Sequence, residues 1–237
     1  MDDWKKLGRC LTYLRNNKDL KYTLGGNHEW NVKWWIDASY GVHNDMKSHS
    51  GATMSLGHGC IYSMSSKQKL NSRSSTEAEL IAVNDAMSKV LWTRLFIESQ
   101  GYEVRSNVIY QENESAILLE KNGKMSSGKH TRHIETRFFF VTDNVDKGKI
   151  NIEYCPTDKM VGDFFTKPLG GAKFRRFRNI IMNCNCDELR AVNMDELVAE
   201  HEKRIMTQVQ FNQDEPTVSK TETAGSQECV ETRSDHM

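Results

Sequence analysis

The stretch Trp34-Trp35-Ile36-Asp37-Ala38-Ser39-Tyr40-Gly41 decides the fold that we predict for this chain. An apolar run ends in a single carboxylate, and small residues and a glycine follow it. This pattern is typical of a buried central strand that delivers Asp37 to its exposed end and then turns. Three later acidic stretches are candidates to meet Asp37, and they contain Glu77, Glu112 and Asp163.

The 237 residues suffice for one good core with a tail, or for two small domains. No apolar run approaches the ~18 residues that a membrane span needs, and the N-terminus lacks the apolar core of a signal peptide. The six cysteines are scattered without a C-x-x-C pair. They indicate free thiols in a reducing compartment and predict no zinc site.

The net charge of zero conceals an asymmetry between the body and the tail. From Asp187 onward there are five Lys/Arg and twelve Asp/Glu residues, a balance of −7, so residues 1–186 carry 27 against 20, a balance of +7. A basic body with an acidic tail indicates a polyanionic partner for the body. On charge alone, a solvated surface that leans positive is an equal alternative.

Hydrophobic periodicity and turn signals predict the order of the elements. The predicted helices cover residues 4–15, 77–100, 113–121, 130–145 and 158–166, and the predicted strands cover 31–38, 52–56, 60–65, 106–110 and 151–155. Gly57-His58-Gly59 is interpreted as the tight turn of a hairpin. Thr76 and Glu79 are interpreted as a capping box that opens the long helix. Beyond residue 186, a helix over 188–206 precedes sequence whose composition is typical of disorder.

This order predicts an α/β fold. It is a mixed five-stranded sheet, with three antiparallel strands plus two parallel ones and helices on both faces. The strand that ends at Asp37 and the strand before Glu112 are expected to lie side by side and parallel, and ligand sites favour the carboxyl ends of such strands. Glu77, at the start of the long helix, and Asp163, at the start of the last helix, would complete the group.

Four converging carboxylates repel one another and require counter-charge. Mg²⁺ or Mn²⁺ supplies it through hard oxygen ligands, and two such ions ~3.5–4 Å apart can activate a water and stabilise the leaving oxygen of a phosphodiester. Each residue alone also has a structural interpretation. Asp37 could cap a turn, Glu77 could favour a helix start through its charge, and Glu112 could be an N-cap. Only the set as a whole points to metal chemistry.

At these residues the sequence resembles the ribonuclease H domain at the C-terminal end of the polyprotein of copia-type long-terminal-repeat retrotransposons. The resemblance covers about residues 4 to 182 and several ordered motifs carry it. The matching runs are residues 35–41 (D-A-x-x-G), 45–51 (D-R-K-S-T-S-G), 65–69, 74–80 (S-S-T-E-A-E-Y), 112–117 (D-N-Q-S-A-I), 130–137 (K-H-I-D-I-R) and 162–169 (A-D-I-F-T-K-P-L).

The resemblance implies a ribonuclease H-like fold and a nuclease that cuts the RNA strand of an RNA–DNA hybrid during reverse transcription. By position, Asp37, Glu77 and Asp163 carry over as catalytic metal ligands, with two Mg²⁺ (or Mn²⁺) ions as the cofactor. Glu112 stands where the family has aspartate. Its additional methylene moves the carboxylate by about 1 Å, whereas metal sites tolerate about 0.5 Å. Gly162 stands at the family's alanine position.

The resemblance also implies domain organisation and partners. Residues 1–28 are expected to be the end of a reverse-transcriptase connection, 29–182 the ribonuclease H-like domain, and 183–237 an acidic tail that is helical at first. The expected partners are the hybrid and the reverse-transcriptase part of the same polyprotein, with no membrane, in cytoplasmic virus-like particles and in the nucleus. Contacts to the hybrid are expected from Asn113, Lys47, Lys67, Arg73, Lys129, Arg132 and Lys167.

Two other functions remain open from the sequence. A catalytically decayed retroelement remnant would keep the fold and act as a nucleic-acid-binding or interaction module. The second alternative is a nuclease or integrase of the same fold that cuts duplex DNA. Uptake of Mn²⁺ distinguishes a working centre from a decayed one, and the preference for hybrid or duplex DNA distinguishes the two nucleases.

Overall fold

The structure of the protein, a computed structural model, describes residues 2–26, 29–122 and 135–184. These residues all belong to one compact unit that comprises residues 1–191. The helix predicted over 188–206 and the start of the helix predicted over 130–145 lie outside the described residues. The predicted domain boundaries at residues 28 and 182 stay predictions.

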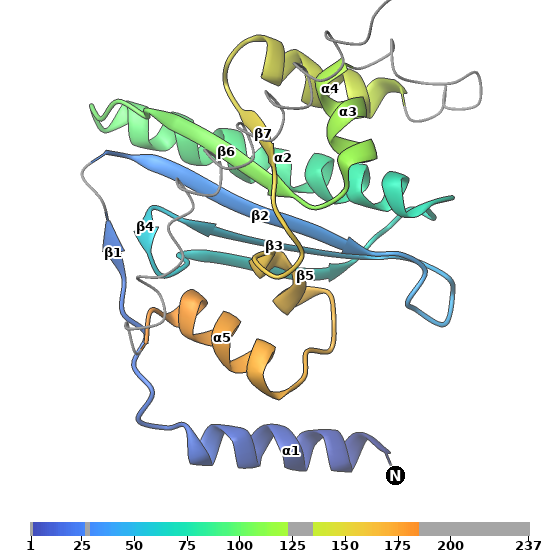
Figure 1. Cartoon of the computed structure of the whole chain (residues 1–237), viewed down its shortest axis with the longest axis vertical. Helices are drawn as coiled ribbons and strands as arrows, with labels where there is room; N and C mark the ends of the chain where they lie inside the picture. The colour runs from blue at the N-terminus through green and yellow to red at the C-terminus, as the bar shows by residue number, and fades with distance from the viewer. Residues whose placement is uncertain (1, 27–28, 123–134, 185–237) are drawn as a thin grey trace, which may run out of the picture. The chain divides into compact units, whose positions relative to one another are not determined.

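Five strands form one mixed sheet in the order β5-β3-β2-β6-β7 (Figure 1). β3 pairs antiparallel with both β2 and β5, whereas β6 pairs parallel with both β2 and β7. The predicted topology of three antiparallel strands plus two parallel ones is therefore confirmed, and it is a ribonuclease H-like fold. The strands are β2 (Asn31–Ser39), β3 (His49–Ser55), β5 (Tyr62–Lys67), β6 (Ser106–Gln111) and β7 (Asn151–Tyr154).

Helices cover both faces of this sheet (Figure 1). α2 (Ser75–Ser99), α3 (Glu114–Asn122) and α4 (Glu135–Asp146) lie on one face, and the 3₁₀ helix η3 (Val161–Phe165) and α5 (Gly171–Met182) lie on the other. α1 (Asp2–Asn16) contacts α5 through an edge-to-face pair of Tyr13 and Phe174, with ring centroids 5.7 Å apart. Among the described helices, none is both long and apolar enough to cross a membrane.

The central strand β2 sends alternate side chains into the two layers. Trp34 and Ile36 are fully buried and belong to the main core, which lies between the sheet and α2. Trp35 points to the opposite face and stacks on Tyr110 of β6, with ring centroids 5.5 Å apart. Because residues two positions apart in a strand share a face, Asp37 lies on the face of Trp35, where η3 packs.

Two regions differ from the sequence prediction. Gly57 and His58 do not form a tight turn, because they form the short strand β4 (Gly57–His58), which pairs with β1 (Gly25–Gly26). The prediction of a simple hairpin turn is therefore wrong, although the strands on either side of it do pair. α5 was not predicted, although its apolar residues recur at helical spacing; Phe177 and Ile181 are buried in it.

Close packing of η3 against the sheet depends on glycine. Gly51 of β3 is the partner of Asp37 in β2, and a Cβ added to Gly51 would lie 2.6 Å from the Cγ2 atom of Thr166. A Cβ on Gly162 would lie 3.1 Å from the Cβ of Asp37. Because both glycines lack a side chain, the segment that carries Asp163 packs directly against the end of β2.

The four cysteines within the described residues are free thiols, as the sequence predicts. Three of them, Cys60, Cys155 and Cys184, are buried, and Cys10 is exposed. Burial raises the pKa of Cys60 to about 11 and that of Cys155 to about 12. These buried thiols are therefore protonated at neutral pH and pack as small apolar groups.

Candidate metal centre

Three of the four predicted carboxylates meet at the end of the parallel strand pair. Asp37, Glu112 and Asp163 each offer one oxygen, and these atoms lie within 4.8 Å of one another. Asp37 is near the end of β2, Glu112 directly follows the neighbouring strand β6, and Asp163 belongs to η3. Both aspartates are fully buried, whereas the side chain of Glu112 keeps 21% exposure. The group therefore opens to solvent on the side of Glu112.

Glu77 takes a different position from the one predicted. Ser74 is the N-cap of α2, and its side chain accepts the backbone N–H of Glu77 at 3.1 Å. The Glu77 carboxylate turns back and accepts the backbone N–H of Arg73 at 2.7 Å. The capping pair is thus Ser74 with Glu77 instead of Thr76 with Glu79. This corrects the expected place of Glu77, which does not belong to the group of three.

Glu79, two residues further along α2, interacts with the end of β2. It is only 4% exposed, and its pKa is raised well above the ordinary value, first by burial and then by the charge of Asp37. A backbone hydrogen bond from Ala38 lowers this pKa, and the charge of Glu112 raises it. Glu79 therefore faces the end of β2. The Ser74-x-x-Glu77 spacing fits a capping box, so the sequence could have assigned Glu77 to the helix cap and left Glu79 as the candidate that faces β2.

Two lysines contact the carboxylates directly. The Nζ atom of Lys167 lies 2.6 Å from Asp163, 3.0 Å from Glu112 and 3.3 Å from Asp37. Lys173 lies 2.7 Å from the second oxygen of Asp163. Burial by itself lowers the pKa of Lys167, but attraction to the carboxylates, above all Asp37, outweighs it and leaves that pKa above its ordinary value.

The pKa of the Asp37 carboxyl is raised although Lys167 lies beside it. Burial raises the pKa of its carboxyl, and the charges of Asp163 and Glu112 raise it further. Lys167 and the Thr166 hydroxyl, which donates to Oδ2 of Asp37, act in the opposite direction. Because the pKa is raised on balance, an added positive charge at this position would favour the ionised carboxylate.

The donor set fits a hard divalent cation. All four groups are carboxylates, the ligands that Mg²⁺ and Mn²⁺ prefer. The Oε2 atoms of Glu79 and Glu112 are buried and have no hydrogen-bond partner among the described residues. Buried acceptors of this kind cost free energy unless they find a donor or a cation. A divalent ion bound by these oxygens would satisfy both and would offset the repulsion.

Three of the predicted nucleic-acid contacts lie on loops or at the end of a strand. Lys67 ends β5 and pairs with Asp45 at 2.6 Å. Lys47 is half-buried in the loop before β3, and Arg73 is exposed just before α2. Their roles toward nucleic acid stay predictions.

The remaining predicted contacts differ in their surroundings. Asn113 accepts the backbone N–H of Ala116 at 3.1 Å and thereby caps α3. Lys129 and Arg132 lie outside the described residues. Lys167 points into the carboxylate group, where its partners are protein oxygens.

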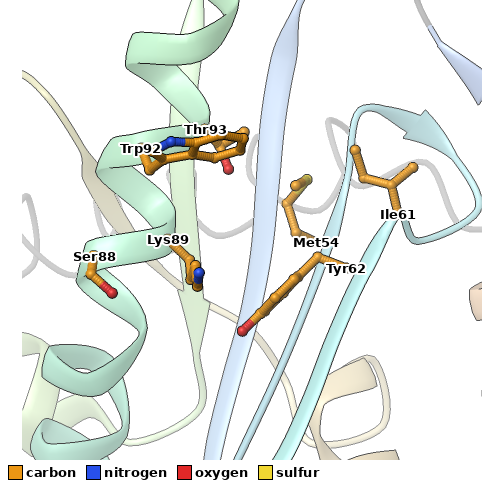
Figure 2. A pocket seen from close by; sticks show the side chains of 7 residues that line it. All are labelled: Met54, Ile61, Tyr62, Ser88, Lys89, Trp92 and Thr93. Atoms are coloured by element: carbon orange, nitrogen blue, oxygen red, sulfur yellow. The ribbon is translucent and has the colours of Figure 1, made fainter.

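A separate pocket of about 510 Å³ lies between α2 and the strands β3 and β5 (Figure 2). Its lining is largely apolar, and Lys89 is its one charged side chain. Its lining contains no carboxylate, histidine or cysteine, so these residues offer no set of metal ligands. Its lining residues are Met54, Ile61, Tyr62, Ser88, Lys89, Trp92 and Thr93.

Comparison with known proteins shows that the chain is similar to transposon proteins. Over 178 residues it is 31% identical to the retrovirus-related Pol polyprotein from transposon RE2 of Arabidopsis thaliana, a match that covers 74% of the chain and 12% of the polyprotein. Over 181 residues it is 27% identical to the corresponding polyprotein from transposon TNT 1-94 of Nicotiana tabacum, with 76% and 13% covered. The chain is similar to one segment of these transposon Pol polyproteins.

This Pol-related chain spans only a small part of the length of these relatives. No protein-family model matches it. Among solved structures, a ribonuclease H1 isolated from compost is 9% identical, with 68% of this chain and 99% of that chain covered and a TM-score of 0.42. The N-terminal ribonuclease H domain of rv2228c from Mycobacterium tuberculosis is also 9% identical, with 63% and 96% covered and a TM-score of 0.40.

Proposed function

We propose that this chain is a metal-dependent endonuclease that cleaves the RNA strand of RNA–DNA hybrids during retrotransposon reverse transcription. The observation that carries the proposal is the convergence of Asp37, Glu112 and Asp163 within 4.8 Å, with Glu79 facing the same strand end. Kinship with transposon Pol polyproteins and the ribonuclease H-like strand order support this choice of substrate.

The proposed ligands are Asp37, Glu79, Glu112 and Asp163, which would hold two Mg²⁺ (or Mn²⁺) ions. Bound there, the ions would supply an activated water and stabilise the leaving oxygen of a phosphodiester. The chain itself positions the carboxylates. The hydroxyl of Ser39, two residues after Asp37, donates to the backbone carbonyl of Thr166 at 3.0 Å and so ties β2 to the segment after η3.

The hybrid would be held by cations around this opening. Lys47, Lys67 and Arg73 lie on the loops and strand end that precede β3 and α2, and with Lys129 and Arg132 they would neutralise backbone phosphates. Contacts to 2′-hydroxyl groups, for which Asn113 is a candidate, would identify the RNA strand.

We further propose that the chain corresponds to a copia-type element. Its partner would be the reverse-transcriptase part of the same kind of polyprotein, and it would act in cytoplasmic virus-like particles and in the nucleus. The motif resemblance and the plant transposon relatives support this setting.

A second candidate function is nucleic-acid binding without cleavage, as in a decayed retroelement remnant. One observation favours it: Glu112 stands where the family has an aspartate. A decayed centre would bind at most one Mn²⁺ ion weakly, so calorimetric titration of Mn²⁺ separates the two candidates.

The direct test is incubation of an end-labelled RNA–DNA hybrid with the protein and Mg²⁺ or Mn²⁺, beside duplex DNA and duplex RNA. We expect cuts in the RNA strand of the hybrid alone. Asp37→Asn should abolish them without lowering the thermal midpoint, since it removes one charge from a repelling group. Cleavage that survives Asp37→Asn would remove this residue from the mechanism, and preferential cutting of duplex DNA would favour a different nuclease of the same fold.

A further inference from the structure

Lys167 lies at the centre of the carboxylate group. It follows Asp163 by four residues, and its side chain returns toward η3. Its Nζ atom contacts Asp163 at 2.6 Å, Glu112 at 3.0 Å and Asp37 at 3.3 Å. The side chain keeps 33% exposure, so one side of it reaches solvent.

Both aspartates of the centre use both of their oxygens. Lys167 donates to Oδ1 of Asp37 and to Oδ1 of Asp163. The hydroxyl of Thr166 donates to Oδ2 of Asp37, and Lys173 donates to Oδ2 of Asp163. The two glutamates differ, because each has a buried Oε2 atom without a partner among the described residues. A divalent ion that binds all four carboxylates must therefore take over aspartate oxygens that Lys167 holds.

We propose that Lys167 is a tethered counter-ion of the carboxylate centre that competes with divalent ions for it. With no ion bound, its ammonium offsets the repulsion among the carboxylates and keeps them together. An ion that binds must displace it from Asp37 and Asp163. The flexible four-carbon stem and the partial exposure let the ammonium move out to solvent. The inference rests on the proposed function only in that the centre binds divalent ions.

Competition of this kind predicts a specific thermodynamic pattern. Because both cations stabilise the same carboxylates, each weakens the binding of the other by the same factor. Removal of the ammonium should therefore destabilise the protein when no divalent ion is present and should raise its affinity for such ions. A lysine that only packed against the site would change stability equally with and without ions.

The test compares Lys167→Met with the wild type, with the charge-retaining Lys167→Arg, and with Lys147→Met as a matched control. Lys147 is suitable because it pairs on the surface with Asp143. Thermal midpoints are measured with EDTA and with saturating Mn²⁺, and Mn²⁺ affinity is measured by calorimetry. We expect Lys167→Met to lower the midpoint in EDTA, to lose that deficit in Mn²⁺, and to bind Mn²⁺ roughly tenfold more tightly. Lys147→Met should match the wild type, and Lys167→Arg should lie near it.

Each failure has its own meaning. A wild type that takes up no Mn²⁺ would overturn the proposed nuclease. A wild type that binds Mn²⁺ while Lys167→Met binds it equally or more weakly would overturn the competition alone. If Lys167→Met does not fold in EDTA, Mg²⁺ titration of the wild type monitored through the ¹⁵Nζ ammonium signal of Lys167 decides the matter. The signal should shift or disappear as Mg²⁺ binds, and an unchanged signal would contradict the proposal.

Discussion

Glu77 and Glu79 are two residues apart in one helix, and variants that remove the carboxylate at each position should behave in opposite ways. Glu77 accepts a backbone N–H at 2.7 Å as part of the N-terminal cap of α2. The loss of a capping interaction costs about 0.5–2 kcal/mol, which lowers the thermal midpoint of a domain of this size by about 1–8 °C. Glu77→Ala, which removes the accepting oxygen, should therefore lower stability by this amount and leave cleavage of the hybrid close to that of the wild type.

Glu79→Gln should do the reverse. The residue is 4% exposed, and its charge is disfavoured by burial and by the neighbouring Asp37 and Glu112. Its neutral isostere removes that unfavourable charge, so the thermal midpoint without divalent ions should stay equal or rise. Loss of one carboxylate ligand should reduce hybrid cleavage more than about 100-fold, beyond the loss that outer-shell partners of a metal cause.

The assay pairs differential scanning fluorimetry in EDTA with single-turnover cleavage of a labelled hybrid in Mg²⁺, for both variants and the wild type. The reasoning fails if Glu77→Ala loses cleavage while keeping its midpoint and Glu79→Gln remains active. That result would return the ligand role to Glu77 and leave Glu79 as a buried structural carboxylate.

Three further predictions concern the same centre and its support. Glu112→Asp, which restores the family residue, should raise hybrid cleavage several-fold, and an unchanged single-turnover rate would show that the longer side chain already fits. Gly51→Ala would place a Cβ 2.6 Å from the Cγ2 atom of Thr166. The resulting overpacking costs about 1–3 kcal/mol, so urea denaturation should show that loss, whereas Gly8→Ala, with open space around it, should not. Burial raises the pKa of Glu120 well above its ordinary 4.5, so this group contributes stability that is complete below pH 4.5 and is lost as the pH rises through its folded pKa. Glu120→Gln should therefore stabilise the protein increasingly above pH 4.5 and little at or below it, and a pH-independent shift in thermal midpoints would contradict that assignment.

Much of the sheet could be predicted from local patterns. The buried run that ends at Asp37 and the β-branched strand before Glu112 are strands in the structure, and they are parallel neighbours as expected. Their apolar content and the long helix between them leave few alternative connections. The β4 strand was missed because two residues, one of them glycine, carry no periodic signal. The α5 helix was missed although Phe174, Phe177 and Ile181 recur at helical spacing, because its basic residues were interpreted only as a charged segment.

The spacing of residues in the sequence did not decide which glutamate of α2 faces the carboxylate group. Both Ser74-x-x-Glu77 and Thr76-x-x-Glu79 fit the pattern of a capping box. The two glutamates are two positions apart in the helix, so their side chains point in directions that differ by about 200° around the helix axis. The wrong choice therefore exchanges the capping glutamate for the one that faces β2.

The sequence by itself determined the α/β sheet, the strand that carries Asp37 and the approach of Glu112 and Asp163 to it, because burial and strand pairing follow from side-chain chemistry along the chain. Only the tertiary structure decided that Glu77 caps α2 while Glu79 interacts with Asp37, and that Lys167 points inward. The direction of a side chain depends on where its element begins and on which charges from distant segments it meets, and neither is written in the local sequence.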